Sequence, residues 1–295
     1  MVWEKSLIKY YNYISIERNL SKNSVESYMR DITQFSKFNI KTPPLKIKRK
    51  NILEYINYIN DQSISARSQA RILSSIRSFY NFLIFENKIT SDPCEHIYSP
   101  KIGSKIPITL SIQEIDKIIE SIDLSQENGE RNRAIIECLY SCGLRVSELI
   151  KLKISNLLFD EKIVQVIGKG NKQRIVPLSN NLIKYLINYI QFIRSKHEID
   201  SKSTDVLFLN RRGKQISRVM VFNIVKDLGN NAGIQKNISP HTFRHSFATH
   251  LVEGGADLRV VQEMLGHTNI TTTEIYTHLN NDYLRQEIID YHPRA

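Results

Sequence analysis

The sequence lacks the features of secreted, membrane-spanning and disulfide-stabilised proteins. Its three cysteines, Cys94, Cys138 and Cys142, are a sparse and odd-numbered set, which suits free thiols in a reducing compartment. No apolar run approaches the ~18 residues that a membrane-spanning helix requires. Glu4 and Lys5 lie within the first turn, so the N-terminus has no signal-peptide pattern. We therefore expect a soluble protein that stays in the cytoplasm.

Acidic residues are also few relative to basic ones. The 295 residues include 41 Lys+Arg and 30 Asp+Glu, which gives a net charge of +11. A positive excess of this kind indicates a polyanionic partner, although solubility alone explains part of it. The length suits one large domain or two ordinary domains.

Residues 3–86 predict four helices. In the first two, apolar residues recur at helical spacing, and Ser21 is positioned to cap the second. A short third helix is expected over 51–59. The fourth runs from Ser65 to about Phe85 and buries one apolar face.

A second face of this fourth helix carries cationic and hydroxyl side chains at spacings of four, three and four residues: Arg67, Arg71, Ser74 and Ser78. Such a row suits contact with a nucleic-acid backbone or groove. It is equally well explained as an ordinary solvated helix face. We predict DNA binding here because of the site residues described below.

Prolines, a glycine and lysines interrupt the helical pattern between residues 92 and 107, a composition typical of an extended, basic linker. We place an N-terminal helical domain at 1–98, the linker at 99–108 and a second domain at 109–295. Such a linker would let two lobes close around a duplex.

The second domain predicts helices and one β-hairpin. Two β-rich runs, 162–167 and 172–178, are joined by Gly-Lys-Gly-Asn, which is a hairpin signal. A further short strand and turn is expected over 206–215. Helices are expected at 111–121, 131–140, 219–228, 240–254 and 282–291. The predicted fold class is therefore mainly α with a small β-sheet.

The last of these helices is amphipathic, with Leu284, Ile288 and Tyr291 on one side. It has no obvious place in a core that is already complete. We therefore expect this helix to dock onto another copy of the protein.

Side chains suited to phosphate chemistry gather between residues 240 and 278. Ser239 and Pro240 begin a helix on which His241 and Arg244 share a face. His267 follows a helix that Asp257 begins and Gly266 ends. Tyr276 falls on a short third helix, because Thr271 and Glu274 have capping-box spacing. All four side chains are therefore held by local structure.

These residue types match the demands of a phosphodiester. The forked donors of arginine fit the negative charge that develops on the non-bridging oxygens, and histidine moves protons near neutral pH. Tyrosine can be a covalent nucleophile, although a phenol with a pKa near ~10 needs a base or a positive field. Taken singly, each residue is more readily explained by a structural role; taken together, less so.

Two further elements add candidates. Arg145 and Glu148 are neighbours on one helix; such a pair is most often a weak surface ion pair, and in a site the carboxylate would hold the guanidinium in position. Lys169 stands between two glycines at the hairpin tip, where it can reach a nearby site as a proton donor or charge. A second strand follows it, which excludes a phosphate-binding P-loop.

With these residues in place, the sequence resembles the tyrosine recombinases of the phage integrase family, of the XerC/XerD type and closer to XerD. The resemblance covers nearly the whole chain and rests on five segments in the family's order: GLRVSEL, VIGKGNKQRIVPL, HTFRHSFATHL, LGHTNITTTEIYTH and HPRA. It implies two lobes, a four-helix core-binding domain and an α/β catalytic domain. Asn156, where the family commonly has an acidic residue, lies outside the catalytic set.

The resemblance also implies roles for the matching residues. Tyr276 would attack the scissile phosphate, form a 3′-phosphotyrosyl link and free a 5′-hydroxyl. Arg145 and Arg244 would clamp the non-bridging oxygens, with Glu148 in support.

Proton transfer and phosphate binding fall to three further matching residues. Lys169 would be the general acid for the departing 5′-oxygen, His241 the base or proton shuttle, and His267 a hydrogen-bond donor to the phosphate. The phosphotyrosine keeps the bond energy, so we expect no ATP, no metal and no other cofactor. The histidine-rich segment after residue 240 lacks the H-E-x-x-H pattern of a zinc site.

Partners follow from the same resemblance. It implies double-stranded DNA with a dif-like site, a tetramer with itself or a paralogue, a Holliday-junction intermediate and a C-terminal helix exchanged between protomers. The biological task would be resolution of chromosome dimers before cell division, with a septal DNA translocase as a further partner. Alternatives are a phage or mobile-element integrase, a type IB topoisomerase and a non-catalytic DNA-binding accessory protein.

Overall fold

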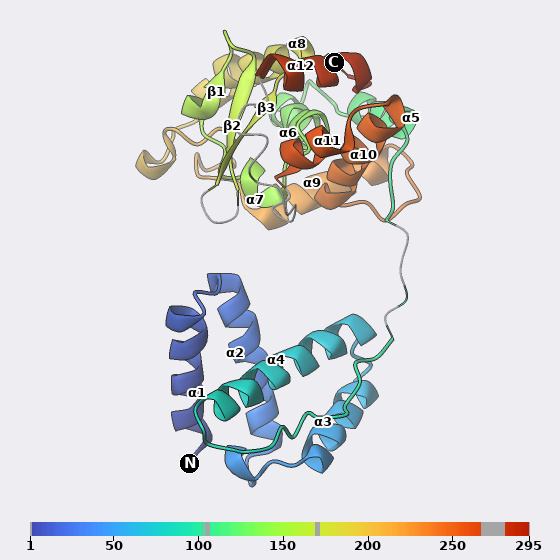
Figure 1. Ribbon diagram of the computed structural model, residues 1–295. Coiled ribbons are helices and arrows are strands. Elements are labelled where there is room, and N and C mark those ends of the chain that lie inside the picture. The colour runs from blue at the N-terminus through green and yellow to red at the C-terminus, as the bar shows by residue number, and fades with distance from the viewer. Residues whose placement is uncertain (1, 102, 104–106, 169–171, 267–280, 295) are drawn as a thin grey trace. The chain divides into compact units, whose positions relative to one another are not determined.

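The computed structural model describes residues 2–101, 103, 107–168, 172–266 and 281–294, without the side chains of 281 and 282 (Figure 1). The chain divides into two compact units, Met1–Lys105 and Ile106–Ala295. Within the described ranges, every helix is too short or too polar to cross a membrane.

The N-terminal unit is built from four helices, as the sequence predicts. They are α1 Trp3–Asn12, extended by a π-helical turn at Tyr13–Glu17, α2 Lys22–Phe38, α3 Arg49–Asp61 and α4 Ala66–Phe85, with a short 3-10 turn at Pro44–Lys46. The hydroxyls of Ser21 and Ser65 accept hydrogen bonds from the backbone N–H groups of Ser24 and Ser68. Both predicted helix starts are therefore confirmed.

Aromatic rings fill the core of this unit. The Trp3 ring stacks on Phe79 of α4 at a centroid distance of 5.8 Å and meets Phe35 of α2 edge-on at 5.8 Å. Tyr10 packs edge-on against Phe79 at 5.2 Å. Because these rings fix the inner face of α4, its Arg67-bearing face is left toward solvent.

The C-terminal unit is mostly helical with one small sheet, which confirms the predicted fold class. Its helices are α5 Ile112–Glu120, α6 Gly129–Ser141, α7 Val146–Leu149, α8 Asn180–Asn188, continued by a π-helical turn at Tyr189–Ile193, α9 Arg218–Asn231, α10 Pro240–Gly254, α11 Leu258–Leu265 and α12 Asn281–Tyr291. Short 3-10 turns occupy Ile154–Asn156, Arg194–Lys196 and Ser201–Ser203. The strands are β1 Leu157–Leu158, β2 Ile163–Ile167 and β3 Gln173–Pro177, antiparallel in the order β1-β2-β3.

Helix α6 lies at the centre of this unit, and most of its residues are buried. The α8 and α10 helices pack on it, and the hairpin of β2 and β3 lies beside α11 and α12 (Figure 1). The hairpin register pairs Ile163 with Pro177 and Ile167 with Gln173. The predicted hairpin is therefore present, and its buried face carries Val164, Val166 and Val176.

The prediction of a regular strand at 206–209 is wrong. Only isolated bridges form there, one between Lys153 and Val206 and one between Leu209 and Gln215. The physical reason is that side chains form hydrogen bonds with backbone groups that a strand would pair. The Tyr189 hydroxyl accepts from the Leu209 N–H at 3.1 Å, and Arg194 Nε donates to the Val206 carbonyl at 3.1 Å.

The premise that the core is complete without the last helix is also wrong. Leu284 and Ile288 of α12 are each only 4% exposed, and they pack within the core of the helix's own unit. The tail that follows is tied down as well, because Arg294 Nη2 donates to Glu137 Oε1 at 2.6 Å. Docking of this helix onto another copy stays a prediction.

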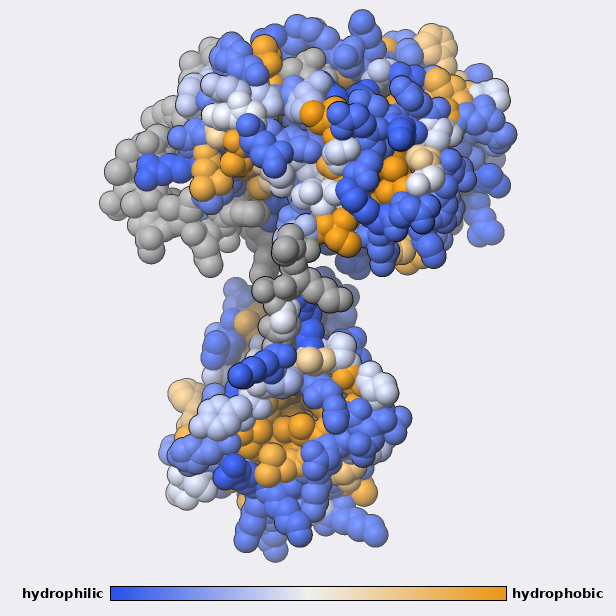
Figure 2. All heavy atoms as spheres, turned by 90° about the vertical axis from the view of Figure 1, so that its right-hand side faces the viewer, coloured by the Kyte–Doolittle hydropathy of each residue, from blue (hydrophilic) through white to orange (hydrophobic). Residues whose placement is uncertain are grey.

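On the face that Figure 2 shows, the surface of both units is mostly hydrophilic, with apolar patches on each. Exposed apolar side chains are spread over many elements; Ile16, Phe85 and Tyr98 are examples. Scattered apolar groups of this kind are ordinary on a folded surface.

Candidate active site

The site begins where α6 turns into α7. Gly143 has a φ of +55°, and a Cβ there would come within 2.5 Å of the Phe247 ring, so glycine is required. The turn places Arg145 just before α7, where its backbone N–H donates to Glu148 Oε2 at 2.8 Å. Its side chain donates from Nη1 to Glu148 Oε1, also at 2.8 Å. The predicted Arg–Glu pair is therefore formed, around a buried carboxylate rather than on the surface.

Helix α10 supplies Arg244. Pro240 stands in its first turn, and the Ser239 N–H donates to the Thr242 hydroxyl at 3.0 Å, which fixes the helix start. Arg244 is buried, and its Nη1 donates to the Gly143 carbonyl at 2.6 Å and lies 3.8 Å from Glu148 Oε2. The guanidinium of Arg244 therefore reaches the same carboxylate as Arg145.

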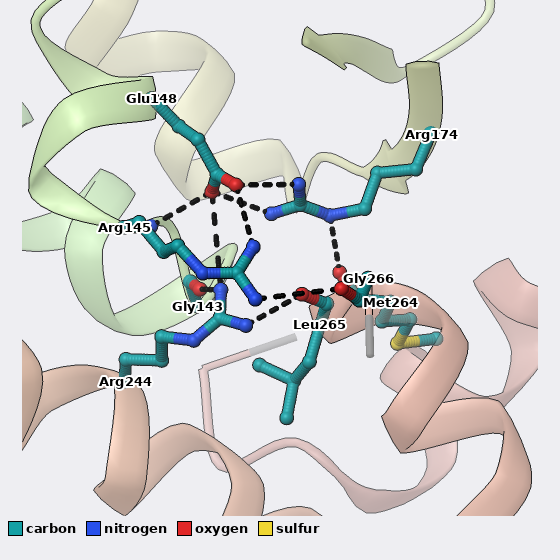
Figure 3. Close-up of polar contacts among 8 residues, drawn as sticks. All are labelled: Gly143, Arg145, Glu148, Arg174, Arg244, Met264, Leu265 and Gly266. Carbon is teal, nitrogen blue, oxygen red and sulfur yellow. Dashed lines mark hydrogen bonds and ion pairs between the residues drawn. The ribbon is translucent and has the colours of Figure 1, made fainter. Parts of the chain in front are cut away.

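A third arginine, Arg174 of β3, joins them and was missed by the sequence reasoning. It binds Glu148 through two parallel hydrogen bonds, from Nη1 to Oε1 at 2.9 Å and from Nη2 to Oε2 at 2.7 Å (Figure 3). A signal for it does exist in the sequence. Arg174 pairs with the buried Val166, so it is a charge on the apolar face of the hairpin. Such a charge requires a buried partner.

The three arginines also close the end of α11. The last carbonyls of a helix lack partners within the helix, and its dipole makes this end negative. Three consecutive carbonyls each accept from a different guanidinium: Met264 from Arg174 Nε at 2.6 Å, Leu265 from Arg244 Nη2 at 2.5 Å, and Gly266 from Arg145 Nη2 at 3.4 Å (Figure 3). The cluster therefore joins α7, α10, β3 and α11.

The electrostatics of the cluster are strongly positive. Burial alone would raise the pKa of Glu148, but the hydrogen bonds and charge of Arg174, together with hydrogen bonds from the backbone and side chain of Arg145, outweigh it and lower this pKa. Burial and the neighbouring charge of Arg145 lower the pKa of Arg244 to about 10, which leaves it protonated at neutral pH. Three positive charges face one negative charge, so the cluster has an excess of two.

Exposure separates the three arginines. The side chain of Arg145 is 31% exposed, whereas those of Arg174 and Arg244 are each 9% exposed. Arg145 is therefore the guanidinium most open to an incoming anion. A partly buried, preorganised positive site of this kind suits a phosphate group and the additional charge that develops when it reacts.

The other predicted site residues are only partly covered by the structure. His241 is exposed and stands on α10, three residues before Arg244. Lys169, His267 and Tyr276 lie outside the described residues, and their roles stay predictions. The chain leads to two of them from Gly168 and Gly266, both of which lie against Arg174.

The predicted DNA-binding face of α4 is present in part. Arg67 and Ser74 are exposed, whereas the Ser78 hydroxyl accepts a hydrogen bond from Tyr10 at 2.8 Å. Arg71 is 40% exposed and is paired with Asp31, a buried carboxylate that the sequence reasoning missed. DNA binding by this face stays a prediction.

Comparison with known proteins identifies the family. A model of the phage integrase family matches residues 109–282, and a model of the N-terminal SAM-like domain of phage integrases matches residues 7–87.

Two curated relatives cover 99% of this chain and all of their own length. The tyrosine recombinase XerD of Staphylococcus haemolyticus is 42% identical over 295 residues, and that of Staphylococcus aureus strain Mu50 is 43% identical. A solved structure of the XerH recombinase bound to its difH substrate is 25% identical, with a TM-score of 0.72 over 91% of this chain and 80% of that chain. The predicted resemblance is thus confirmed, and this chain belongs to the phage integrase family as a tyrosine recombinase of the XerD type.

Proposed function

We propose that this protein cuts and rejoins DNA strands at a dif-like site through a covalent link between Tyr276 and the DNA. The observation that carries the proposal is the cluster of guanidinium groups around Glu148, in a chain that is similar to XerD along its whole length. Such a cluster is a site for a phosphate anion, and a tyrosine recombinase requires one.

The charge of the cluster suits the reaction. A phosphodiester carries one negative charge, and attack on phosphorus places further negative charge on its non-bridging oxygens. Arg145 and Arg244 bind these oxygens, and Glu148 keeps the two guanidiniums in place before the substrate arrives. Donors that are fixed in this way typically contribute about 10²–10³-fold in rate.

The covalent step uses Tyr276, Lys169 and His267, which lie outside the described residues, together with His241 of α10. The Tyr276 oxygen forms a bond to phosphorus as the bond to the 5′-oxygen breaks. The phenol proton passes to His241, Lys169 donates a proton to the departing 5′-oxygen, and His267 hydrogen-bonds the phosphate. Because a 5′-hydroxyl can attack the phosphotyrosine and reverse the step, neither ATP nor a metal is required.

The DNA partner is proposed from charge and from relatives. The net charge of +11 favours a polyanion, and the XerH relative was solved with a dif-type DNA in a post-cleavage complex. We infer that this chain binds double-stranded DNA at a dif-like site. Arg67, Arg71 and Ser74 of α4 contribute contacts to the backbone or groove.

The biological setting is inferred in the same way. The protein acts in the cytoplasm as a tetramer, with itself or with a paralogue, and resolves chromosome dimers before cell division. A septal DNA translocase would control the reaction.

The test uses a duplex that carries the dif-like site of the protein's own chromosome, nicked so that the cleaved fragment diffuses away. Wild-type protein should accumulate a covalent protein–DNA adduct. Tyr276→Phe should bind the duplex with unchanged affinity and give no adduct, because it lacks the attacking oxygen. Tyr283→Phe, at a tyrosine that is 45% exposed on α12, is the matched control and should still give adduct. An adduct from Tyr276→Phe would exclude this tyrosine as the nucleophile.

A further inference from the structure

We propose that Arg174 is a positioning residue for strand cleavage, which holds the Glu148–Arg145 pair, the start of the hairpin tip and the end of α11 in one arrangement. The inference rests on the proposed function and adds to it a residue outside the predicted catalytic set. Arg174 is argued to act through other groups rather than on the phosphate itself.

The first argument is that Arg174 is occupied within the protein. Each of its three guanidinium nitrogens donates to a protein acceptor, two to Glu148 and one to the Met264 carbonyl. Its side chain is 9% exposed, against 31% for Arg145. An incoming phosphate therefore meets Arg145 far more readily than Arg174.

The second argument is the way in which Glu148 is shared. Each carboxylate oxygen accepts one hydrogen bond from Arg174 and one from Arg145. The planar fork of Arg174 matches both oxygens at once and so fixes the plane of the carboxylate. That plane in turn sets the direction of the Arg145 guanidinium. Without Arg174, the carboxylate can turn toward Arg244, which is 3.8 Å from Oε2.

The third argument is the position of two glycines against Arg174. A Cβ at Gly168 would lie 3.7 Å from Arg174 Nη1 and 3.7 Å from Glu148 Oε1. A Cβ at Gly266, which has a φ of +64°, would lie 3.2 Å from Arg174 Cδ. A Cβ at Gly168 would make ordinary contacts with Arg174 and Glu148, whereas one at Gly266 would be crowded against Arg174 and strained by the positive φ. Both chain segments therefore lie next to the Arg174 guanidinium.

These glycines precede Lys169 and His267 in the sequence. Arg174 also binds the Met264 carbonyl, so it fixes the end of α11 two residues before Gly266. One side chain thus sets the points from which the chain continues to the predicted general acid and the predicted phosphate ligand. It sets the direction of the most exposed arginine at the same time.

The experiment compares Arg174→Met, which removes the charge and the fork, with Arg174→Lys, which keeps the charge alone. Arg194→Met is the matched control, because Arg194 is also buried in this unit and donates to the carbonyls of Val206, Ser203 and Thr204. Single-turnover cleavage of the nicked duplex is measured at saturating protein, below the unfolding temperature of every variant. Affinity is measured by gel shift.

We expect Arg174→Met to cleave on the order of 10²-fold more slowly, as for a small misplacement of reacting groups, with affinity within about threefold of wild type. Arg174→Lys should recover only part of the rate, because a single ammonium cannot hold both carboxylate oxygens. Arg194→Met should lose stability and keep its cleavage rate while folded. Equal losses of rate in Arg174→Met and Arg194→Met would overturn the proposal in favour of a general structural role.

A double variant with Glu148→Gln, measured below its own unfolding temperature, tests whether Arg174 and Glu148 act through each other. Because Arg174 acts in part through Glu148, adding Arg174→Met to Glu148→Gln should slow cleavage much less than the order of 10²-fold that the same change costs in wild type. Losses that multiply would show that Arg174 acts independently, and a loss confined to affinity would make it a phosphate ligand. Should wild-type protein form no adduct, the proposed function would fail instead, which is a separate outcome.

Discussion

The carboxylate of Glu148 should dominate the stability of the C-terminal unit. Its side chain is 3% exposed and faces three guanidiniums, of which Arg145 and Arg174 donate to it at 2.7–2.9 Å. Glu148→Gln keeps the shape of the side chain and removes the negative charge. The three guanidinium groups then remain close together with no carboxylate between them. Breaking a buried pair in this way costs about 3–5 kcal/mol. At about 2–4 °C per kcal/mol for a unit of this size, Tm should fall by roughly 6–20 °C.

The pH dependence of stability provides an independent test of the role of the Glu148 charge. The pKa of Glu148 is lowered in the folded protein, so its contribution is fully present above the unfolded pKa of about 4.3 and is lost as the pH falls through the folded value. The difference in Tm between wild type and Glu148→Gln should therefore be large at pH 7 and shrink below pH ~4.

Thermal unfolding followed by circular dichroism at both pH values is the assay. Glu161→Gln, at an exposed glutamate of the same unit, is the control and should stay within about 0.5 kcal/mol of wild type. If Glu148→Gln unfolds within that same margin at pH 7, the arginines are not held by this carboxylate. A difference that persists unchanged at low pH would show that the effect of Glu148 is not its charge.

Two further predictions concern residues away from the cluster. Arg71→Ala should reduce the slope of log DNA affinity against log salt concentration by about 0.9, the effect of one phosphate contact. Asp31→Asn should weaken DNA binding too, because the Arg71 guanidinium is then no longer held in position. An unchanged slope would make this face of α4 a solvated surface. Burial lowers the pKa of His292 to about 3, so its contribution to stability is present above pH ~6.5 and declines as the pH falls toward 3. His292→Phe should therefore flatten the change in the urea midpoint between pH 7 and pH 5, and an equal change in both proteins would contradict the buried neutral imidazole.

Local signals in the sequence predicted most of the fold. Ser21 caps its helix as predicted, and Ser65 and Ser111 cap helices at the predicted starts, because a cap and the N–H groups that it binds lie within three residues of each other. The hairpin of β2 and β3 follows from its glycine-rich turn and alternating residues for the same reason. Helix α8 was overlooked, although Ser179 caps it and Leu182 and Leu186 lie on one face.

The ion pairs that sequence reasoning missed join residues that are distant in the chain. Arg174 binds Glu148, 26 residues away, and Met264, 90 residues away. Arg71 binds Asp31, 40 residues away, on a neighbouring helix. Spacing along one helix or strand cannot show such pairs, although a charge on an apolar face shows that a partner must exist.

The arginine cluster holds donors in place for a phosphate, and this arrangement lowers the stability of the fold. Three guanidiniums with one carboxylate repel one another, and burial adds a desolvation penalty for each charge. An apolar cluster of equal volume would stabilise the fold more, but it would offer no donors to a phosphate. The end of α11 reduces this penalty, because three carbonyls at the negative end of the helix dipole accept from the same arginines. Helix α11, which precedes the predicted nucleophile in the chain, therefore also supports the charges that the proposed reaction requires.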